Sequence, residues 1–309
     1  MNIDNSRANA FRTCPWMYYE QFERNGTGVE RNEVTDGYTP LELGSRVHEL
    51  LEVKYKIQQG QVAPDYAPSA NEALEREAQW ILQAYNAHYP NDRWEVLDVE
   101  RTFRIALPKY CNQCYSLAAK YEDSWHCPNC GCYLGHNDVD HHVIGKMDML
   151  YRDLNDGRLY IVDHKTEKRG AKSNLPQKWA SRDQASIYLW AAARLYKEQV
   201  AHFVVNILTR PSEAGKVGPS FPERQKLERT PMQIETAIRD LVIVADDIER
   251  YRRIFGDGPW PANREECYGW GTCPYYQLHT FGEDVELILK HKFSPKKEYL
   301  NLVNIKTTI

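Results

Sequence analysis

Hydrophobic and polar positions along the chain follow two patterns, one helical and one strand-like. Helical patterning, with apolar residues every three or four positions, predicts five helices, at 5–24, 40–59, 70–88, 182–198 and 231–254. Apolar runs of strand length predict four strands, at 95–107, 142–152, 158–164 and 204–208. Cys14-Pro15 interrupts the first helix, and Ser69 is the expected N-cap of the third, with Glu72 three residues on. This order predicts helices first and then an α/β core.

Two stretches break these patterns. Residues 108–137 are polar, rich in cysteine and weakly periodic, and residues 259–279 are irregular and contain Pro, Gly and Cys. The sequence therefore predicts one large domain made of 1–107 and 138–282, a small module inserted at 108–137, and a C-terminal tail at 283–309 of no assigned structure.

Composition and charge narrow the class of protein. The 309 residues are 42% hydrophobic and 27% charged, as in ordinary globular proteins. No apolar run reaches the length of a membrane span and no signal-peptide pattern opens the chain, so we expect a cytoplasmic protein without a membrane partner. The net charge of −4 gives no global basic field, so binding of a nucleic acid would need a local basic groove.

Five of the eight cysteines lie in the predicted insert. Cys111, Cys114, Cys127 and Cys130 form two CxxC pairs, and four thiolates at this spacing complete a tetrahedral Zn²⁺ site, a zinc ribbon. Cys132 is a fifth thiol that would replace Cys130 or stay free. The alternative is a set of reduced thiols without metal. The ribbon would contact DNA, dock a protein partner or only cross-link the loop. An insert this short has no hydrophobic core of its own, so zinc binding would supply its folding energy.

Two acids and a lysine flank a predicted hairpin. The sequence NDG at 155–157 is a strong turn signal, and a turn there brings Asp148 and Asp163 onto neighbouring strands, near each other though not necessarily opposite. Lys165 lies two residues beyond Asp163 and so projects to the same face. Carboxylates hold hard divalent cations, which activate water, while a lysine stabilises developing negative charge. The alternative is a pair of surface charges at a hairpin.

Two helical pairs flank this hairpin in sequence. Gly44 lies one turn before His48, so the glycine would let a strand approach while the imidazole becomes a metal ligand. Gln184 and Tyr188 share one face of a later helix and would touch the nucleotide or its phosphate. The alternative for each is a polar side chain that only forms hydrogen bonds with its surroundings.

Five motifs in this order resemble the RecB-like branch of the PD-(D/E)XK nucleases, which includes CRISPR-associated exonucleases and phage-encoded relatives. They are SRANAFRTCPWMYYE, GSRVHELLE, GKMDML, IVDHKT and QASIY. The resemblance covers about residues 6–280, without the cysteine-rich insert. It implies a PD-(D/E)XK core with a central mixed β-sheet flanked by helices, a Mg²⁺ or Mn²⁺ requirement, and DNA as substrate.

The resemblance also implies roles for single residues. His48, Asp148 and Asp163 would ligate the cation, and Lys165 would be catalytic. Gln184 and Tyr188 would form the supporting motif that follows the active site.

Many members of this branch hold an iron–sulfur cluster with one N-terminal and three C-terminal cysteines. Cys14, Cys267 and Cys273 match three of these positions, and the fourth cysteine is absent near His279. Either the histidine replaces it in a 4Fe–4S site, or the cluster is lost and the thiols only pack.

The leading hypothesis is a metal-dependent DNA exonuclease acting at single-stranded ends, in phage or bacterial recombination, repair or replication. The alternative is a non-catalytic nucleic-acid-binding or assembly protein that keeps the fold and docks through its ribbon. A sequence-specific endonuclease ranks last. Basic and aromatic residues near the site would guide the strand or form a solvated loop: Lys146, His164, Lys168, Arg169, Lys172, Lys178 and Trp179.

Overall fold

The computed structural model describes residues 1–31, 37–90, 92–136, 141–168, 175–211, 217–269, 272–280 and 285–295. Arg169, Lys172 and most of the predicted tail lie outside these ranges. The chain forms two compact units. Unit 1 comprises Met1–Val34, Phe103–Gly145 and Glu235–Ile309, and unit 2 comprises Thr35–Thr102 and Lys146–Ile234.

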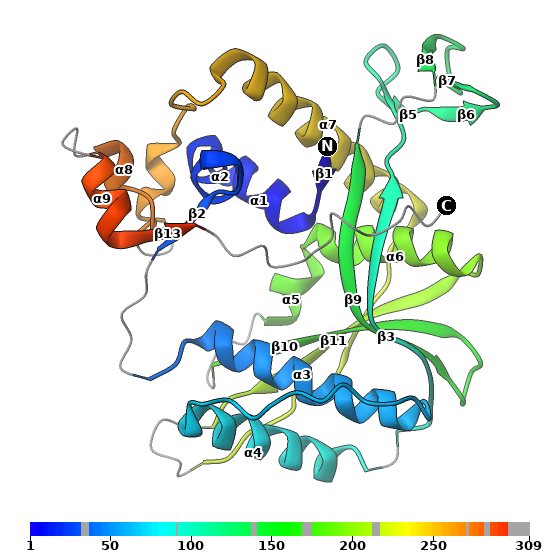
Figure 1. Cartoon of the computed structure of the whole chain (residues 1–309). Coiled ribbons are helices and arrows are strands. Elements are labelled where there is room, and N and C mark those ends of the chain that lie inside the picture. Colours follow the sequence, from blue (N-terminus) through cyan, green and yellow to red (C-terminus); the bar gives the residue numbers. More distant parts are fainter. Residues whose placement is uncertain are drawn as a thin grey trace. The chain divides into compact units, whose positions relative to one another are not determined.

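A mixed β-sheet organises unit 2 (Figure 1). Its strands are β3 (Trp94–Ala106), β9 (His142–Asp153), β10 (Leu159–Glu167), β11 (Val200–Thr209) and β12 (Gln225–Leu227). β10 pairs with β9 in the antiparallel sense and with β11 in the parallel sense, and β12 continues antiparallel to β11. β3 pairs with β9. The predicted mixed sheet with helices is therefore confirmed.

Helices cover both faces of this sheet. α3 (Pro40–Gln58) and α4 (Glu72–His88) share one apolar core with strand residues that include Val162 and Val204. Phe203, the neighbour of Val204, points to the opposite face because side chains alternate along a strand. Its ring lies 5.9 Å from that of Tyr188, which belongs to α6 (Asp183–Tyr196). α6 therefore covers the face opposite to α3 and α4.

Side-chain caps set where α3 and α4 begin. Thr39 caps α3 in a reciprocal capping box with Glu42. Asn71 caps α4, because its Oδ1 accepts hydrogen bonds from the amides of Ala73 and Leu74, each at 3.1 Å. The prediction that Ser69 caps this helix is wrong, since its hydroxyl instead accepts the amide of Asn71.

The helices of unit 1 include α1 (Asn5–Thr13), α2 (Pro15–Phe22), most of α7 (Pro231–Phe255), and α9 (Val285–Lys292). Pro15 begins α2, so the predicted interruption at Cys14-Pro15 is present. β1 (Asn2–Ile3) runs parallel to the start of β9. β13 (Phe293–Pro295), in the tail without an assigned structure, pairs with β2 (Val29–Arg31). Among the described residues, no helix has both the length and the apolar character needed to cross a bilayer.

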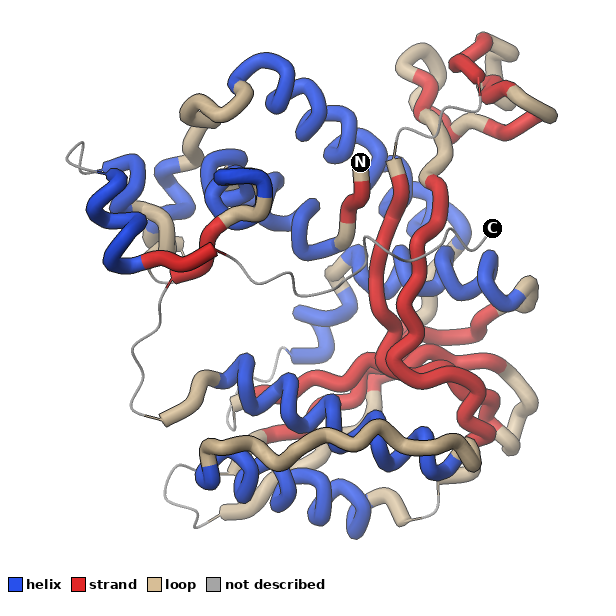
Figure 2. The backbone as a smooth tube through the Cα atoms, in the orientation of Figure 1, coloured by secondary structure: helices blue, strands red, loops and turns tan. Residues whose placement is uncertain are grey.

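The cysteine-rich segment of unit 1 consists of short strands joined by loops (Figure 2). β4 (Tyr110–Cys111) and β5 (Ser116–Leu117) form one hairpin. β6 (Ala119–Tyr121), β7 (Ser124–His126) and β8 (Tyr133–His136) form a three-stranded sheet. The smaller elements elsewhere are α5 (Leu175–Ala180), α8 (Gln277–Thr280) and the 3₁₀ turns Arg24–Gly26 and Arg264–Cys267.

An ion pair joins the two helices of the unit 2 core. Arg46 of α3 donates two hydrogen bonds to Glu75 of α4, at 2.7 and 3.0 Å. This bidentate contact is the main reason that the pKa of Glu75 falls to about 2. The folded state therefore stabilises the ionised form of the Glu75 carboxylate more than the unfolded chain does.

We expect Glu75→Gln to lower the free energy of unfolding near pH 7 by about 1–2 kcal/mol, after allowance for partial exposure. Because folding lowers this pKa, the stabilisation is present above the unfolded pKa and is lost as pH falls toward 2. Urea unfolding at a series of pH values measures the difference. A loss that is equal at pH 7 and near pH 3 would contradict this account, and exposed Arg76→Gln is the control.

Candidate active site

The β9–β10 ladder ends where its two acids meet. The paired residues run from Leu159 opposite Arg152 to Val162 opposite Met149. The next residues in this register are Asp163 and Asp148. The ladder stops there, and the amide that follows Asp163 donates to the side-chain oxygen Oδ2 of Asp148 at 2.7 Å. The hairpin thus brings together the two predicted acids.

Asp163 is almost fully buried, with 2% of its surface exposed. Its Oδ1 accepts hydrogen bonds from Lys165 Nζ at 2.9 Å and from Gln184 Nε2 at 3.0 Å. Lys165 Nζ also lies 2.7 Å from Oδ2, but that oxygen has no hydrogen-bonded partner among the described residues. The Lys165 ammonium therefore lies against both oxygens of the buried carboxylate, and Gln184 adds a hydrogen bond to one of them.

His48 joins these acids from α3. Its Nε2 lies 2.9 Å from the carbonyl oxygen of His164, and since a carbonyl only accepts, Nε2 carries the proton. The other nitrogen, Nδ1, lies 3.6 Å from Asp148 Oδ2. Metal-ligating histidines commonly donate their second N–H to a carbonyl in this way. The contact leaves Nδ1 directed toward the acids.

Glu100 is a site residue that the sequence did not predict. It lies on β3 with a positive φ of 52°, and its Oε1 is 3.8 Å from His48 Nδ1. Its second oxygen pairs with Lys146. The sequence carries only a slight signal of this irregular backbone. Val96 and Val99, which are both buried, are three residues apart, so strand alternation breaks just before Glu100.

Burial and like charge perturb this cluster. Burial, and then the charges of Asp163 and Glu100, raise the pKa of Asp148 to about 6, against the lowering influence of His48 and Lys165. Burial opposes protonation of His48, but Asp148 and Glu100 outweigh it and raise its pKa to about 9. Clustered groups of perturbed pKa are typical of functional sites.

The donor set fits a divalent cation. One ligand atom from each of His48, Glu100 and Asp148 lies within 4.8 Å of the others. Carboxylate oxygens bind hard divalent cations, and an imidazole nitrogen is a common ligand of transition metals. Asp163 lies outside that group of three, although the amide that follows it binds Asp148.

Gln184 and Tyr188 do not play equal parts in this cluster. Gln184 reaches Asp163 directly, whereas the Tyr188 hydroxyl donates to the backbone carbonyl of Lys146 at 3.0 Å. Gly44 lies against β10, since a Cβ there would sit 3.0 Å from Thr166 Oγ1. The small residue therefore sets how closely α3 approaches the strand that carries Asp163.

His164 is a buried support and not a surface cation. It is 2% exposed, and burial holds its pKa well below the usual range, so its ring is neutral. Its Nδ1 accepts a hydrogen bond from Asn206 at 2.8 Å, and its ring stacks on Tyr55. The prediction that His164 guides a nucleic-acid strand is wrong. Its backbone instead fixes His48 and Asp148.

Two cysteine turns face each other in the ribbon segment. Backbone amides two and three residues later donate to the sulfurs of both Cys111 and Cys127. For Cys127, these amides and the hydroxyl of Ser116, which is the largest influence, lower the pKa to about 6. Stabilised thiolates are the form that binds metal.

Sulfur spacing in this segment fits one tetrahedral ion. Cys111 Sγ lies 3.8 Å from Cys130 Sγ and 3.4 Å from Cys132 Sγ, and sulfurs around Zn²⁺ lie about 3.8 Å apart. The four sulfurs within 4.8 Å of one another belong to Cys111, Cys127, Cys130 and Cys132. Cys114 also touches the group, because hydrogen bonding to Cys130 is the first of the influences that raise its pKa to about 12.

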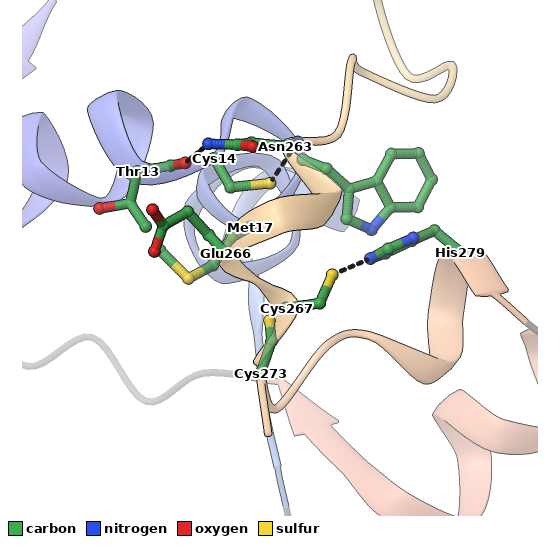
Figure 3. A pocket seen from close by; sticks show the side chains of 9 residues that line it. Thr13, Cys14, Met17, Asn263, Glu266, Cys267, Cys273 and His279 are labelled. Carbon is green, nitrogen blue, oxygen red and sulfur yellow. Dashed lines mark hydrogen bonds between the residues drawn. The ribbon is translucent and has the colours of Figure 1, made fainter. Parts of the chain in front are cut away.

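A second cysteine cluster lies in unit 1 and consists of Cys14, Cys267, Cys273 and His279. These residues line a small pocket (Figure 3). Cys267 Sγ is 3.5 Å from His279 Nε2, and the Asn263 amide donates to Cys14 Sγ at 3.3 Å. The ligand atoms of these four described residues do not all lie within 4.8 Å of one another, whereas those of the ribbon group do.

Comparison with known proteins identifies the family. The model of the PD-(D/E)XK nuclease superfamily matches residues 5–278. A solved structure titled "Crystal structure of SSO0001" is 14% identical over 71% of this chain and 78% of that chain, with a TM-score of 0.26. No curated protein matches the chain.

The positive φ of Glu100 predicts that glycine at this position is more stable than alanine. Because glycine adopts this region without strain, Glu100→Gly should exceed Glu100→Ala in unfolding free energy by about 1 kcal/mol. Both variants lose the carboxylate, so the comparison isolates the backbone. At neighbouring Arg101, where φ is not positive, alanine should be the more stable replacement. Urea unfolding of all four variants measures both differences, and the same order at the two positions would contradict the strain.

Proposed function

Because this chain belongs to the PD-(D/E)XK nuclease superfamily, we propose that it is a metal-dependent DNA exonuclease of the RecB-like branch that acts at single-stranded ends. The proposal rests on how the charged side chains are arranged at the end of the β9–β10 ladder. There the amide that follows Asp163 binds the Asp148 carboxylate, Lys165 contacts Asp163, and His48 Nδ1 lies 3.6 Å from Asp148 Oδ2.

In this proposal His48, Asp148 and Asp163 hold Mg²⁺ or Mn²⁺, and Glu100 joins them. A cation bound there would supply an activated water and would neutralise charge on the phosphoryl group. Lys165 is held by Asp163 in its charged form: burial opposes protonation, but Asp163 and Asp148 outweigh it and raise the pKa of the amine. It thus presents a fixed positive charge to a phosphate.

Gln184 and Tyr188 support this arrangement from α6. Gln184 donates to Asp163 Oδ1 and so fixes the carboxylate, whose other oxygen lies 2.7 Å from the Lys165 ammonium. Tyr188 secures the backbone at Lys146, whose side chain in turn pairs with Glu100. We expect both residues to orient the acids and to act on DNA only through them.

The rival proposal is a non-catalytic nucleic-acid-binding or assembly protein that docks a partner through its ribbon. Loss of an active-site residue is typical of such proteins. Here Asp148, Asp163 and Lys165 are all present, Lys165 contacts Asp163, and the amide after Asp163 binds Asp148. This retention favours the enzyme.

The two cysteine clusters extend the proposal. We propose Zn²⁺ in the ribbon, held by Cys111, Cys127, Cys130 and either Cys114 or Cys132, and a 4Fe–4S cluster at the second site. Its ligands would be Cys14, Cys267, Cys273 and His279. The domain boundaries given above, a cytoplasmic location and a role in phage or bacterial DNA recombination, repair or replication stay predictions.

We expect the purified chain with Mn²⁺ to degrade linear single-stranded DNA and to spare circular single-stranded DNA, which has no ends. Asp163→Asn and Lys165→Ala should each lower the rate by about 10²-fold or more, since each removes a charged group from the site. Release of labelled nucleotides over time measures both effects.

Asp156→Asn is the matched control, since Asp156 lies in the turn of the same hairpin and not at the ladder end. Cleavage of the circle would favour an endonuclease. Binding of DNA without any metal-dependent cleavage would favour the docking protein.

The cysteine proposals predict one zinc and four irons per chain after anaerobic purification, with visible absorption from the cluster. Cys14→Ser should lose the iron and keep the zinc, and Cys111→Ser should do the reverse, because the two sites share no ligand. Elemental analysis with the absorption spectrum measures this. Zinc without iron would leave the second site as packed thiols, and iron retained in His279→Ala would exclude this histidine as an essential ligand.

A further inference from the structure

Three cations of unit 2 gather around the ring of Trp179 in α5. Lys165 Nζ lies 5.2 Å from the ring centroid, Lys178 Nζ 5.0 Å and Arg182 Cζ 4.6 Å. Trp179 itself is buried, with 7% exposed. An indole face attracts a cation, but three like charges around one ring repel each other and need negative partners.

Two of the three cations have such partners. Lys165 pairs with Asp163, and Lys178 Nζ lies 3.0 Å from Glu167 Oε1. Arg182 is exposed, and within the described part of the chain its guanidinium pairs with no acidic side chain. One positive charge beside the catalytic lysine is therefore left without a counterion.

The backbone around Arg182 is held in place. Its amide donates to Trp179 O at 3.2 Å, and its carbonyl accepts from Arg229 Nη2 at 3.4 Å. Arg229 Nη2 also binds Ala180 O, at 2.5 Å. Arg182 is the N-cap residue of α6, two positions before Gln184, which contacts Asp163. The side chain is thus positioned from both ends, by the pinned backbone and by the indole.

We propose that Arg182, stacked on Trp179, binds the strand phosphate adjacent to the one being cleaved. This inference rests on the proposed nuclease function and adds a substrate contact to it. A guanidinium stacked on an aromatic face still offers its N–H groups in the plane, where they match phosphate oxygens in pairs. Lys165 and Arg182 share one ring, so they are placed to contact successive phosphates of a single strand. Trp179 is the positioning residue for both.

The consequence is a division of labour between two cations. Lys165 contacts Asp163 and acts at the phosphate undergoing reaction, whereas Arg182 contributes to affinity. Loss of Arg182 should therefore raise KM and leave kcat within about twofold, because uniform binding is removed. Loss of Lys165 should lower kcat.

The test is binding of a fluorescent oligothymidine by the full chain in the non-cleaving Asp163→Asn background, at several salt concentrations. Arg182→Gln should weaken binding about tenfold, as expected for a charge-assisted contact. The slope of log affinity against log salt should become shallower by about 0.7, the value for one phosphate of a single strand. Arg182→Lys keeps the charge and should restore the slope while recovering only part of the affinity.

Arg194→Gln is the matched control. Arg194 is also exposed and stacks on a tryptophan of α6, with Cζ 3.8 Å from the Trp190 centroid. It lies twelve residues along the helix, about 18 Å away. Its loss should leave affinity and slope unchanged.

The outcomes separate the two proposals. If Arg182→Gln binds like the wild type while the wild type cleaves DNA, the contact is wrong and the nuclease stands. If Arg194→Gln weakens binding equally, the effect is general charge and the assigned contact is wrong. If the wild type neither binds nor cleaves DNA, both proposals are wrong.

Discussion

Asp148 and Asp163 place two carboxylates at the buried end of one β-ladder. The residues around them compensate for the cost of burying these like charges. Burying like charges together is costly unless positive groups or hydrogen bonds compensate. Lys165 comes from the same strand, His48 from α3 and Gln184 from α6. The helices on both faces of the sheet thus each supply one compensating group, and a bound cation would complete the balance.

Local patterns in the sequence predicted that Asp148, Asp163 and Lys165 lie close together. The turn at 155–157 fixes the hairpin, and period-two alternation puts Asp163 and Lys165 on one face. The long helices and the main strands followed from their periodicity, and the mixed sheet followed from the family resemblance. Gly44 and His48 could be paired because they lie one helical turn apart.

Other features depend on contacts that no local pattern encodes. Glu100 reaches the cluster through a left-handed residue in a strand, so its direction depends on backbone geometry. His164 looks like a surface cation in sequence, yet its neighbours Tyr55 and Asn206 come from distant segments and enclose it. The proximity of Cys132 to Cys111 depends likewise on how two loops meet. Pairing of β13 with β2 joins segments about as far apart as the chain allows.

The segmented make-up of unit 1 has a consequence for the order of folding. Cys14 accepts a hydrogen bond from Asn263, and the Trp16 amide donates to Pro261 O, so α1 and α2 need a segment made much later. All of unit 2 lies between these segments in the sequence. Domains generally fold as units during synthesis. Unit 2 can therefore fold first, while the apolar faces of α1 and α2 remain without their partners until residues 261–263 have been synthesised.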